Sequence, residues 1–263
     1  MFVVLKKTAL IACLVAVLCL TALCVGLRAT GGAAVYFGKT ERLVPIYRVD
    51  TDCGKVALTF DAAWGSDSTL GILSVLEEYN VPATFFLVQF WAEKYPDLVK
   101  KIDAQGIEIG THSATHPHMP KLSEAKIRVE LESSMKALQQ ITGKTPTVFR
   151  PPYGDYDNKL LTTASALGLK TIQWDVDSLD WKGLSAAEIA TRVVSNAKSG
   201  SIILMHNDGE HTLEALPLII EGLTNKGLGC CSVGELVYKD NYYIDAAGVQ
   251  HTSAPATAQT AAI

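Results

Sequence analysis

The sequence predicts an α/β fold: a distorted (β/α) barrel of about seven parallel strands, preceded by an N-terminal transmembrane helix. Short apolar runs alternate with amphipathic stretches along the chain, polar residues follow several of these runs, and residues 8–27 carry no charge. A chain of 263 residues with 48% hydrophobic side chains can bury one substantial core, but it is too short for two large domains.

The expected strands are the short apolar runs. They cover residues 55–60, 83–87, 108–110, 147–149, 170–174, 201–205 and 228–232. The expected helices lie between them. They cover residues 67–79, a segment that ends near 106, residues 123–142 and 158–167, a segment that begins at the capping box of Ser185 and Glu188, and residues 213–226. Strands that alternate with helices favour a parallel sheet, either open or closed into a barrel.

The positions of polar side chains distinguish an open sheet from a closed barrel. One follows each of five predicted strands: Asp61, His112, Arg150, Asp177 and His206. A (β/α) barrel gathers the carboxyl ends of all its strands at one mouth, whereas an open sheet gathers only those near its switch point. The pattern therefore favours the barrel.

The N-terminus predicts export. Lys6 and Lys7 precede an uncharged segment about as long as a membrane-spanning helix, and they would stay inside. We expect residues 1–28 to be a single-pass anchor or a signal, residues 29–52 a stalk, 53–240 the main folded domain and 241–263 a flexible tail. A cleaved signal peptide is the rival interpretation, because residues 29–34 are rich in small side chains, and the domain would then be secreted.

The net charge bears on the class of partner, and the cysteines bear on a possible disulfide. A net charge of -4 argues against a nucleic-acid binder, which usually has a basic surface. Three cysteines lie beyond the apolar segment: Cys53, Cys230 and Cys231. Because the first and last strands of a closed barrel are neighbours, Cys53 could bridge Cys230 or Cys231.

Two imidazoles predict a metal site. His112 and His116 are four residues apart, so both rings can face one cation, and imidazole suits zinc, cobalt or nickel. The alternative is a helix N-terminus with polar caps. His118 could be a third ligand, although we expect it to be a packing or rim residue.

Acid and base candidates accompany this pair. Asp61 after a buried strand is costly unless it is paired or functional, and Arg150 in a rigid proline-rich loop could orient a carboxylate. Among Asp175, Asp177 and Asp180, one could hold His206 protonated, as a general acid requires. Taken singly, each of these residues also has a structural interpretation: a helix cap, a surface turn or a satisfied core histidine.

Together these segments resemble the NodB-homology polysaccharide deacetylases, carbohydrate esterase family 4, over about residues 53–240. The resemblance lies in H-S-A-T-H from His112, R-P-P-Y from Arg150, D-S-L-D-W from Asp177 and L-M-H from Leu204. The A-A-W-G segment after Asp61 is similar to the sporulation-associated branch.

The resemblance implies hydrolysis of an N-acetyl amide on a glycan such as peptidoglycan or chitin. His112 and His116 would hold a divalent metal, Zn²⁺ by expectation, with Co²⁺ or Mn²⁺ as alternatives, that activates a water. Asp61 would accept the proton of that water, and His206 would protonate the departing amine.

The resemblance also assigns supporting residues. Arg150 would orient Asp61, and Asp177 would orient His206. The backbone N–H of Tyr153 would hold the oxyanion, while Trp181 and Leu204 would shape the acetyl pocket.

One position departs from the family pattern. The first motif usually reads T-F-D-D, and its second aspartate is a metal ligand, but here that residue is Ala62. Asp67 or an extra water would have to complete the shell. A catalytically silent glycan-binding barrel therefore stays an alternative. A third is an amidase acting on a small cyclic amide, which the export signal disfavours.

Overall fold

A computed structural model describes residues 14–19, 21 and 42–253 of the chain. Residues 1–41 and 42–263 form two separate units. Of the expected membrane span only residues 14–19 and 21 are described, and they are helical. Among all described residues, no helix has both the length and the apolar character needed to cross a bilayer. The anchor thus stays a prediction.

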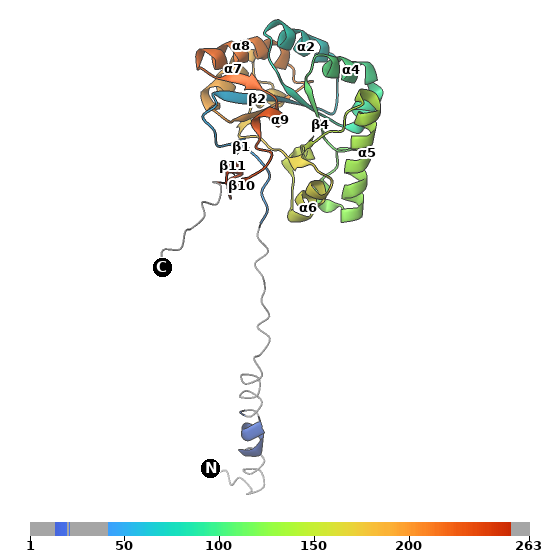
Figure 1. The fold of residues 1–263 in the computed structure, drawn as a ribbon, viewed down its shortest axis with the longest axis vertical. Helices are drawn as coiled ribbons and strands as arrows, with labels where there is room; N and C mark the ends of the chain where they lie inside the picture. Colours follow the sequence, from blue (N-terminus) through green and yellow to red (C-terminus); the bar gives the residue numbers. More distant parts are fainter. Residues whose placement is uncertain (1–13, 20, 22–41, 254–263) are drawn as a thin grey trace, which may run out of the picture. The chain divides into compact units, whose positions relative to one another are not determined.

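The parallel sheet predicted from the sequence is confirmed. Its strands follow the order β6-β5-β4-β3-β2-β8-β7, and β9 pairs with the first half of β2, all in parallel (Figure 1). The bounds are β2 Lys55–Ala62, β3 Thr84–Leu87, β4 Glu108–Thr111, β5 Val148–Phe149, β6 Lys170–Thr171, β7 Val176–Asp177, β8 Ile202–His206 and β9 Gly229–Cys231.

The connection between β6 and β7 shows that this sheet is curled. The two strands lie at opposite ends of the strand order, yet only the residues between Thr171 and Val176 join them. Such a segment spans at most about 17 Å, whereas seven strands laid flat would be nearly 30 Å wide, about 4.8 Å per strand. The two edges must therefore approach each other, as in a distorted barrel.

Helices cover the outside of the barrel (Figure 1). They are α2 Thr69–Glu78, α3 Gln89–Lys94, α4 Pro96–Ala104, α5 Glu124–Thr142, α6 Asn158–Ala166, α7 Ala186–Asn196, α8 Thr212–Asn225 and α9 Val233–Leu236, with short 3-10 turns at Met119–Lys121, Pro152–Gly154 and Asp180–Lys182. Local sequence fixes their ends. Ser123 caps α5, Gly143 ends it at a φ of 74°, and the predicted capping box of Ser185 and Glu188 begins α7.

The alternation of β2 separates the helix layer from the inside of the barrel. Val56, Leu58 and Phe60 join the large apolar cluster that includes residues of the surrounding helices. Thr59 and Asp61 point the other way, because side chains alternate along a strand, and both contact the same arginine inside the barrel. One face of β2 thus packs into the apolar core, and the other presents Thr59 and Asp61 to the inside of the barrel.

The structure differs from the sequence prediction at both ends of the domain. Residues 241–252 are not a flexible tail: β10 (Tyr242–Ile244) and β11 (Val249–Thr252) form a small sheet with β1 (Arg48–Val49). The described part of the expected stalk, residues 42–52, likewise enters the fold, where Ile46 bridges Ile172 beside β6. Residues 29–41 of the expected stalk and 254–263 of the expected tail lie outside the described residues. Pairing partners about 200 residues apart in sequence escape local patterns.

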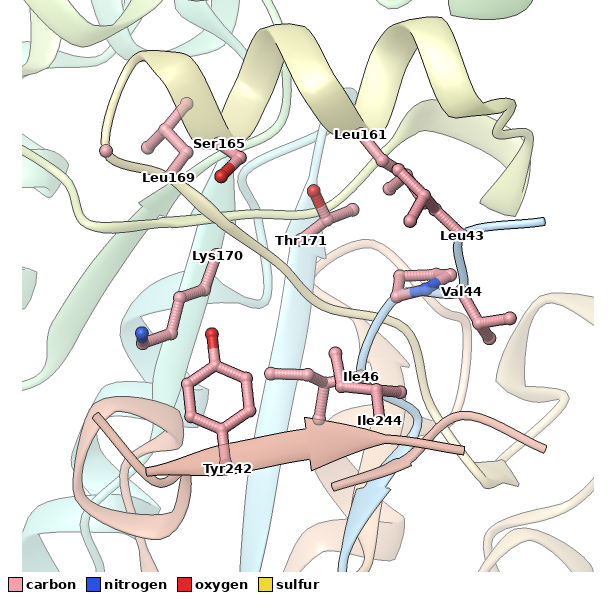
Figure 2. A pocket seen from close by; sticks show the side chains of 12 residues that line it. Leu43, Val44, Ile46, Leu161, Ser165, Leu169, Lys170, Thr171, Tyr242 and Ile244 are labelled. Atoms are coloured by element: carbon pink, nitrogen blue, oxygen red, sulfur yellow. The ribbon is translucent and has the colours of Figure 1, made fainter. Parts of the chain in front are cut away.

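Both ends also line one cavity of about 300 Å³ with residues of α6 and β6. Figure 2 shows Tyr242 and Ile244 of β10 opposite Leu43 and Leu161 there.

Two further expectations concern strand pairing. The predicted strand at 170–174 is shorter than expected, since β6 ends at Thr171, and β7 across the barrel opening was not predicted. The first and last core strands are neighbours as predicted. The thiols of Cys53, Cys230 and Cys231 are nevertheless free, so the proposed disulfide is not formed.

Candidate active site

The carboxyl ends of the strands enclose a cavity of about 620 Å³. All nine site residues predicted from the sequence lie in or beside it. Eight of them line it: Asp61, His112, His116, Tyr153, Asp177, Trp181, Leu204 and His206. The ninth, Arg150, is fully buried behind the cavity wall. The barrel mouth therefore brings together residues that lie far apart in the sequence.

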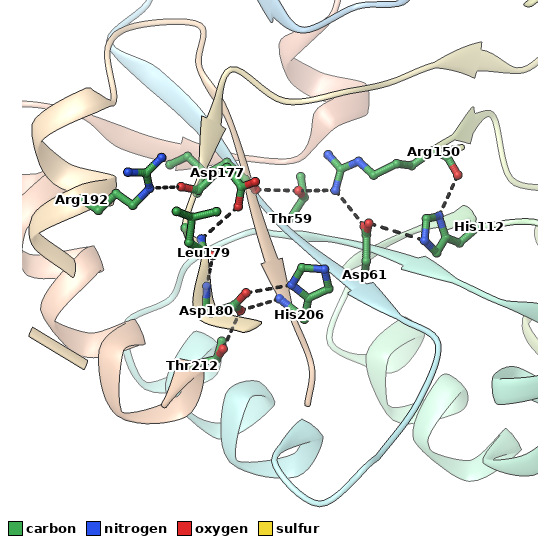
Figure 3. A network of polar contacts seen from close by, with 12 residues as sticks. Thr59, Asp61, His112, Arg150, Asp177, Leu179, Asp180, Arg192, His206 and Thr212 are labelled. Atoms are coloured by element: carbon green, nitrogen blue, oxygen red, sulfur yellow. Dashed lines mark hydrogen bonds and ion pairs between the residues drawn. The ribbon is translucent and has the colours of Figure 1, made fainter. Parts of the chain in front are cut away.

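Asp61 and Arg150 form a buried ion pair (Figure 3). Arg150 Nη1 donates to Asp61 Oδ1 at 2.8 Å and to Thr59 Oγ1 at 2.7 Å, and Nη2 donates to the Gln173 carbonyl at 3.1 Å. The guanidinium also lies 4.2 Å from the centre of the Phe86 ring. These contacts fix the orientation of the Asp61 carboxylate, the arrangement expected from the sequence.

His112 has a defined tautomer. Its Nδ1 lies 2.7 Å from the carbonyl oxygen of Arg150, which can only accept, so Nδ1 carries the proton. The lone pair of Nε2 then points into the site, 3.6 Å from Asp61 Oδ2. The His116 ring lies 4.9 Å from the His112 ring, and its buried Nδ1 has no hydrogen-bond partner among the described residues. The two rings are therefore neighbours, and each has a nitrogen atom that no protein hydrogen bond to a described residue occupies.

The loop that carries these histidines is held by Glu130 of α5. Its Oε2 accepts from the backbone N–H groups of Ala114 (2.9 Å) and Thr115 (2.8 Å), and its Oε1 accepts from Thr115 Oγ1. Ser113 and His116 have φ values of 73° and 57°, which non-glycine residues adopt rarely. The loop is a strained turn rather than a helix, and Glu130 supplies fixed acceptors for it.

His206 is oriented by Asp180, not by Asp177 as expected (Figure 3). Asp180 Oδ1 lies 2.8 Å from His206 Nδ1, and its Oδ2 accepts from the His206 backbone N–H and from Thr212 Oγ1. Asp177 Oδ1 instead accepts from the Leu179 N–H at 2.9 Å. The reason is the left-handed turn at Leu179, with a φ of 56°, which places Asp180 beneath the imidazole.

The site shifts the pKa values of Asp61 and His206 in opposite directions. Burial alone would raise the pKa of Asp61, but Arg150 and then the neighbouring imidazoles outweigh it, so the pKa lies below its usual value. Burial would lower the pKa of His206, but the hydrogen bond and charge of Asp180 raise it above its usual value. Burial lowers the pKa of His116 to about 4 and also lowers that of His112. The environment therefore favours the anionic form of Asp61, the protonated form of His206 and the neutral form of the histidine pair.

Aromatic side chains form the cavity walls. Tyr153 and Trp181, expected from the sequence, are 56% and 59% exposed, and Trp174 joins them. Tyr153 has a φ of 61° within the R-P-P-Y turn. His118 stacks on Tyr153 at 4.3 Å and pairs with Asp155, which places it at the rim rather than in a ligand shell.

The residues do not complete a three-ligand metal site. Within the described part of the chain, no group of three or more His, Cys, Asp or Glu side chains could hold a metal ion. Ala62 is fully buried in the apolar cluster, and at this turn it is Ala63 that lines the cavity. Catalytic zinc usually has three protein ligands. The histidine pair supplies two, and Asp67, considered as a substitute, does not line the cavity.

Sequence reasoning missed several site residues. Glu130 gives no local signal, because it lies on the long helix α5 and reaches the loop only in the folded chain. Trp64 and Asp208 also line the cavity. The strand-end position of both, directly after β2 and β8, was the signal that could have found them.

Comparison with known proteins agrees with this geometry. The polysaccharide deacetylase family profile matches residues 48–172. A peptidoglycan-N-acetylglucosamine deacetylase of Bacillus cereus is 40% identical over 200 residues, covering 74% of this chain and 73% of the relative. The crystal structure of a pseudoenzyme of carbohydrate esterase family 4 from Bacillus anthracis superimposes with a TM-score of 0.71 at 34% identity, covering 73% of this chain and 68% of that one. A mutant of that pseudoenzyme with restored enzymatic activity matches at 35% identity with the same TM-score, covering 73% of this chain and 70% of that one.

Proposed function

Because the chain belongs to the polysaccharide deacetylases of carbohydrate esterase family 4, we propose that it removes N-acetyl groups from a cell-envelope glycan, with peptidoglycan as the expected substrate. The similar peptidoglycan deacetylases support this substrate class. Support from the chain itself comes from the chemistry of the cavity.

One observation carries the proposal: a carboxylate with a lowered pKa and an imidazole with a raised pKa line the same cavity. Near neutral pH, Asp61 can accept a proton and His206 can donate one. Two titratable groups whose environments push their pKa values apart are the usual arrangement of an acid and base pair.

In the proposed reaction, Asp61 accepts a proton from the water whose oxygen attacks the acetyl carbonyl carbon. The tetrahedral intermediate then collapses, the C–N bond breaks, and His206 donates its Nε2 proton to the departing amine. The products are acetate and a glucosamine-type sugar. Arg150 holds Asp61 in position and Asp180 holds His206, while Leu204 and Trp181 would enclose the acetyl group. The Tyr153 N–H would stabilise the oxyanion.

A metal is typical of this family. Two imidazoles without a third protein ligand are expected to hold Zn²⁺, Co²⁺ or Mn²⁺ weakly. The missing third ligand favours a second candidate function, a glycan-binding domain without turnover. Ala62, which stands where the family has a metal-binding aspartate, supports this function, as does the similarity to a pseudoenzyme of the same family.

Acetate release from peptidoglycan or N-acetylglucosamine oligomers distinguishes the two functions. We expect release by the wild type, increased by added Zn²⁺ or Co²⁺, and a loss of at least about 100-fold in His206→Gln, because general acid catalysis contributes that much. His251→Gln is the matched control, since His251 pairs with Asp50 and Asp245 outside the cavity. Oligomer binding without acetate release under any metal condition would establish the silent function instead.

Asp61→Asn is a poorer test of the mechanism. It would leave the fully buried guanidinium of Arg150 without its charge partner, which typically costs about 3–5 kcal/mol of stability. Loss of activity in that variant could therefore reflect unfolding.

We also propose that the catalytic domain works outside the cytoplasm, tethered by residues 1–28 or secreted after their removal, and that it serves sporulation. The uncharged N-terminal segment and the A-A-W-G segment support these two proposals, respectively. Membrane fractionation and the mass of the mature N-terminus test the first, and expression during sporulation tests the second.

A further inference from the structure

Trp64 lines the active-site cavity but has no part in the proposed hydrolysis. It lies in the loop between β2 and α2, with 56% of its surface exposed. Its indole meets the His116 ring edge-on, with ring centres 4.8 Å apart. A large apolar ring exposed beside a cleft is a common feature of binding surfaces, since a ligand can cover it.

The loop holds this indole in a fixed place. The Gly65 carbonyl accepts hydrogen bonds from the buried Trp91 Nε1 at 2.6 Å and from Asn207 Nδ2 at 3.1 Å. Gly65 itself has a φ of 59°, and a Cβ there would lie 2.7 Å from the Cβ of Asp208. Only glycine fits this turn. Backbone contacts at Gly65, rather than contacts of the indole, therefore fix the turn that directs Trp64 to the cavity.

Trp64 also begins a continuous row of rings. From Trp64 the row passes to His116, then to Tyr153 at 4.6 Å from His116, and then to His118 at 4.3 Å from Tyr153. His118 is anchored by Asp155. Trp64, His116 and Tyr153 of this row also line the cavity that contains Asp61.

We propose that Trp64 is a stacking platform for a second sugar of a linear N-acetylated glycan, next to the sugar whose acetyl group enters the cavity. The apolar face of a pyranose can cover the indole while its hydroxyl groups stay in water. The domain then recognises at least two consecutive units. This inference rests on the proposed glycan substrate.

Calorimetric titration tests it with N-acetylglucosamine and its β-1,4-linked tetramer as probes. We expect the wild type to bind the tetramer more tightly than the monomer. Trp64→Ala should weaken tetramer binding about tenfold, the contribution of one aromatic stacking contact, and leave monomer binding unchanged. Trp64→Phe, which keeps a planar ring, should recover most of the difference.

Tyr243→Ala is the matched control, because Tyr243 is 55% exposed but lies on β10, outside the cavity. An equal effect of Trp64→Ala on both probes, or no effect on either, would overturn the inference while leaving the proposed substrate intact. If the wild type binds neither probe, the proposed function itself is wrong. Unchanged circular dichroism of each variant shows that folding is preserved.

Discussion

Replacing Asp180 by asparagine separates the two candidates for the partner of His206. In the structure Asp180 is fully buried and contacts His206 through both the ring Nδ1 and the backbone N–H. The sequence resemblance assigned this role to Asp177. Asp177→Asn therefore serves as the matched comparison, with the same chemical change three residues away.

The magnitude follows from the contacts that are lost. The substitution Asp180→Asn would keep a similar side-chain shape but would remove a buried charge that holds an imidazolium, the Thr212 hydroxyl and a backbone N–H. Loss of such a partner typically costs about 3 kcal/mol, of which a charged hydrogen bond alone contributes about 1.5–3 kcal/mol. Asp177 makes one backbone contact through its carboxylate, so its replacement should cost about 1 kcal/mol or less.

The sign of the pH dependence follows from the raised pKa of His206. Its contribution to stability is complete below the unfolded pKa, near 6.5, and is lost as the pH rises through the folded pKa. The stability difference between wild type and Asp180→Asn should thus be larger at a pH of about 5.5 than at about 9. Urea unfolding at both pH values measures it.

Nuclear magnetic resonance titration of the His206 ring gives the direct readout. We expect a lower pKa in Asp180→Asn, an unchanged one in Asp177→Asn, and an alkaline limb of acetate release that moves to lower pH only in the first variant. An unchanged His206 titration in Asp180→Asn, or an equal shift in both variants, would refute the assignment.

The remaining predictions concern the histidine pair. Calorimetry should show weak Zn²⁺ binding by the wild type and none by His112→Ala; tight binding by the wild type would mean that a third ligand exists. Ala62→Asp should lose about 2–3 kcal/mol of stability in chelator, because it buries a carboxylate in an apolar cluster, and Zn²⁺ should stabilise it more than the wild type; equal stabilisation of both would place the new carboxylate away from the pair. Glu130→Ala should cost about 1–3 kcal/mol by leaving the N–H groups of Ala114 and Thr115 without an acceptor, and it should weaken Zn²⁺ binding; unchanged thermal unfolding would show that the loop holds itself.

The sequence was most informative where a local pattern coincides with a structural period. The strand over residues 55–60 and the helix over 123–142 were predicted within two residues, because apolar runs and capping residues mark them directly. The placement of polar residues after strands was equally informative, since parallel strands end at one mouth whatever their order. This placement alone predicts that Asp61, His112 and His206 lie together, and all three line the cavity.

Choices that depend on the folded backbone could not be predicted. Asp177 and Asp180 are both aspartates of the same short segment, so the sequence does not distinguish them. The left-handed turn at Leu179 determines that Asp180 is the one that reaches His206. The strands after residue 241 pair partly with a segment that is distant in sequence, because β11 joins both β10 and β1, and no local pattern reveals the partnership with β1. Glu130 depends on packing between α5 and β4.

The pairing of β1 with β11 has a consequence for the order of assembly. Arg48 lies opposite Val249 and also bridges Ser201, so the first strand of the domain meets its earliest strand partner only after about 150 further residues and its partner in the small sheet later still. Closing so long a loop is slow relative to local contacts. The barrel core can form earlier from neighbouring strands and helices, and β1 and β11 would then pair last. A nascent chain would therefore leave the edge of β1 that faces β11 unpaired until Val249–Thr252 has been synthesised, and shortening the protein at residue 240 would leave that edge permanently unpaired.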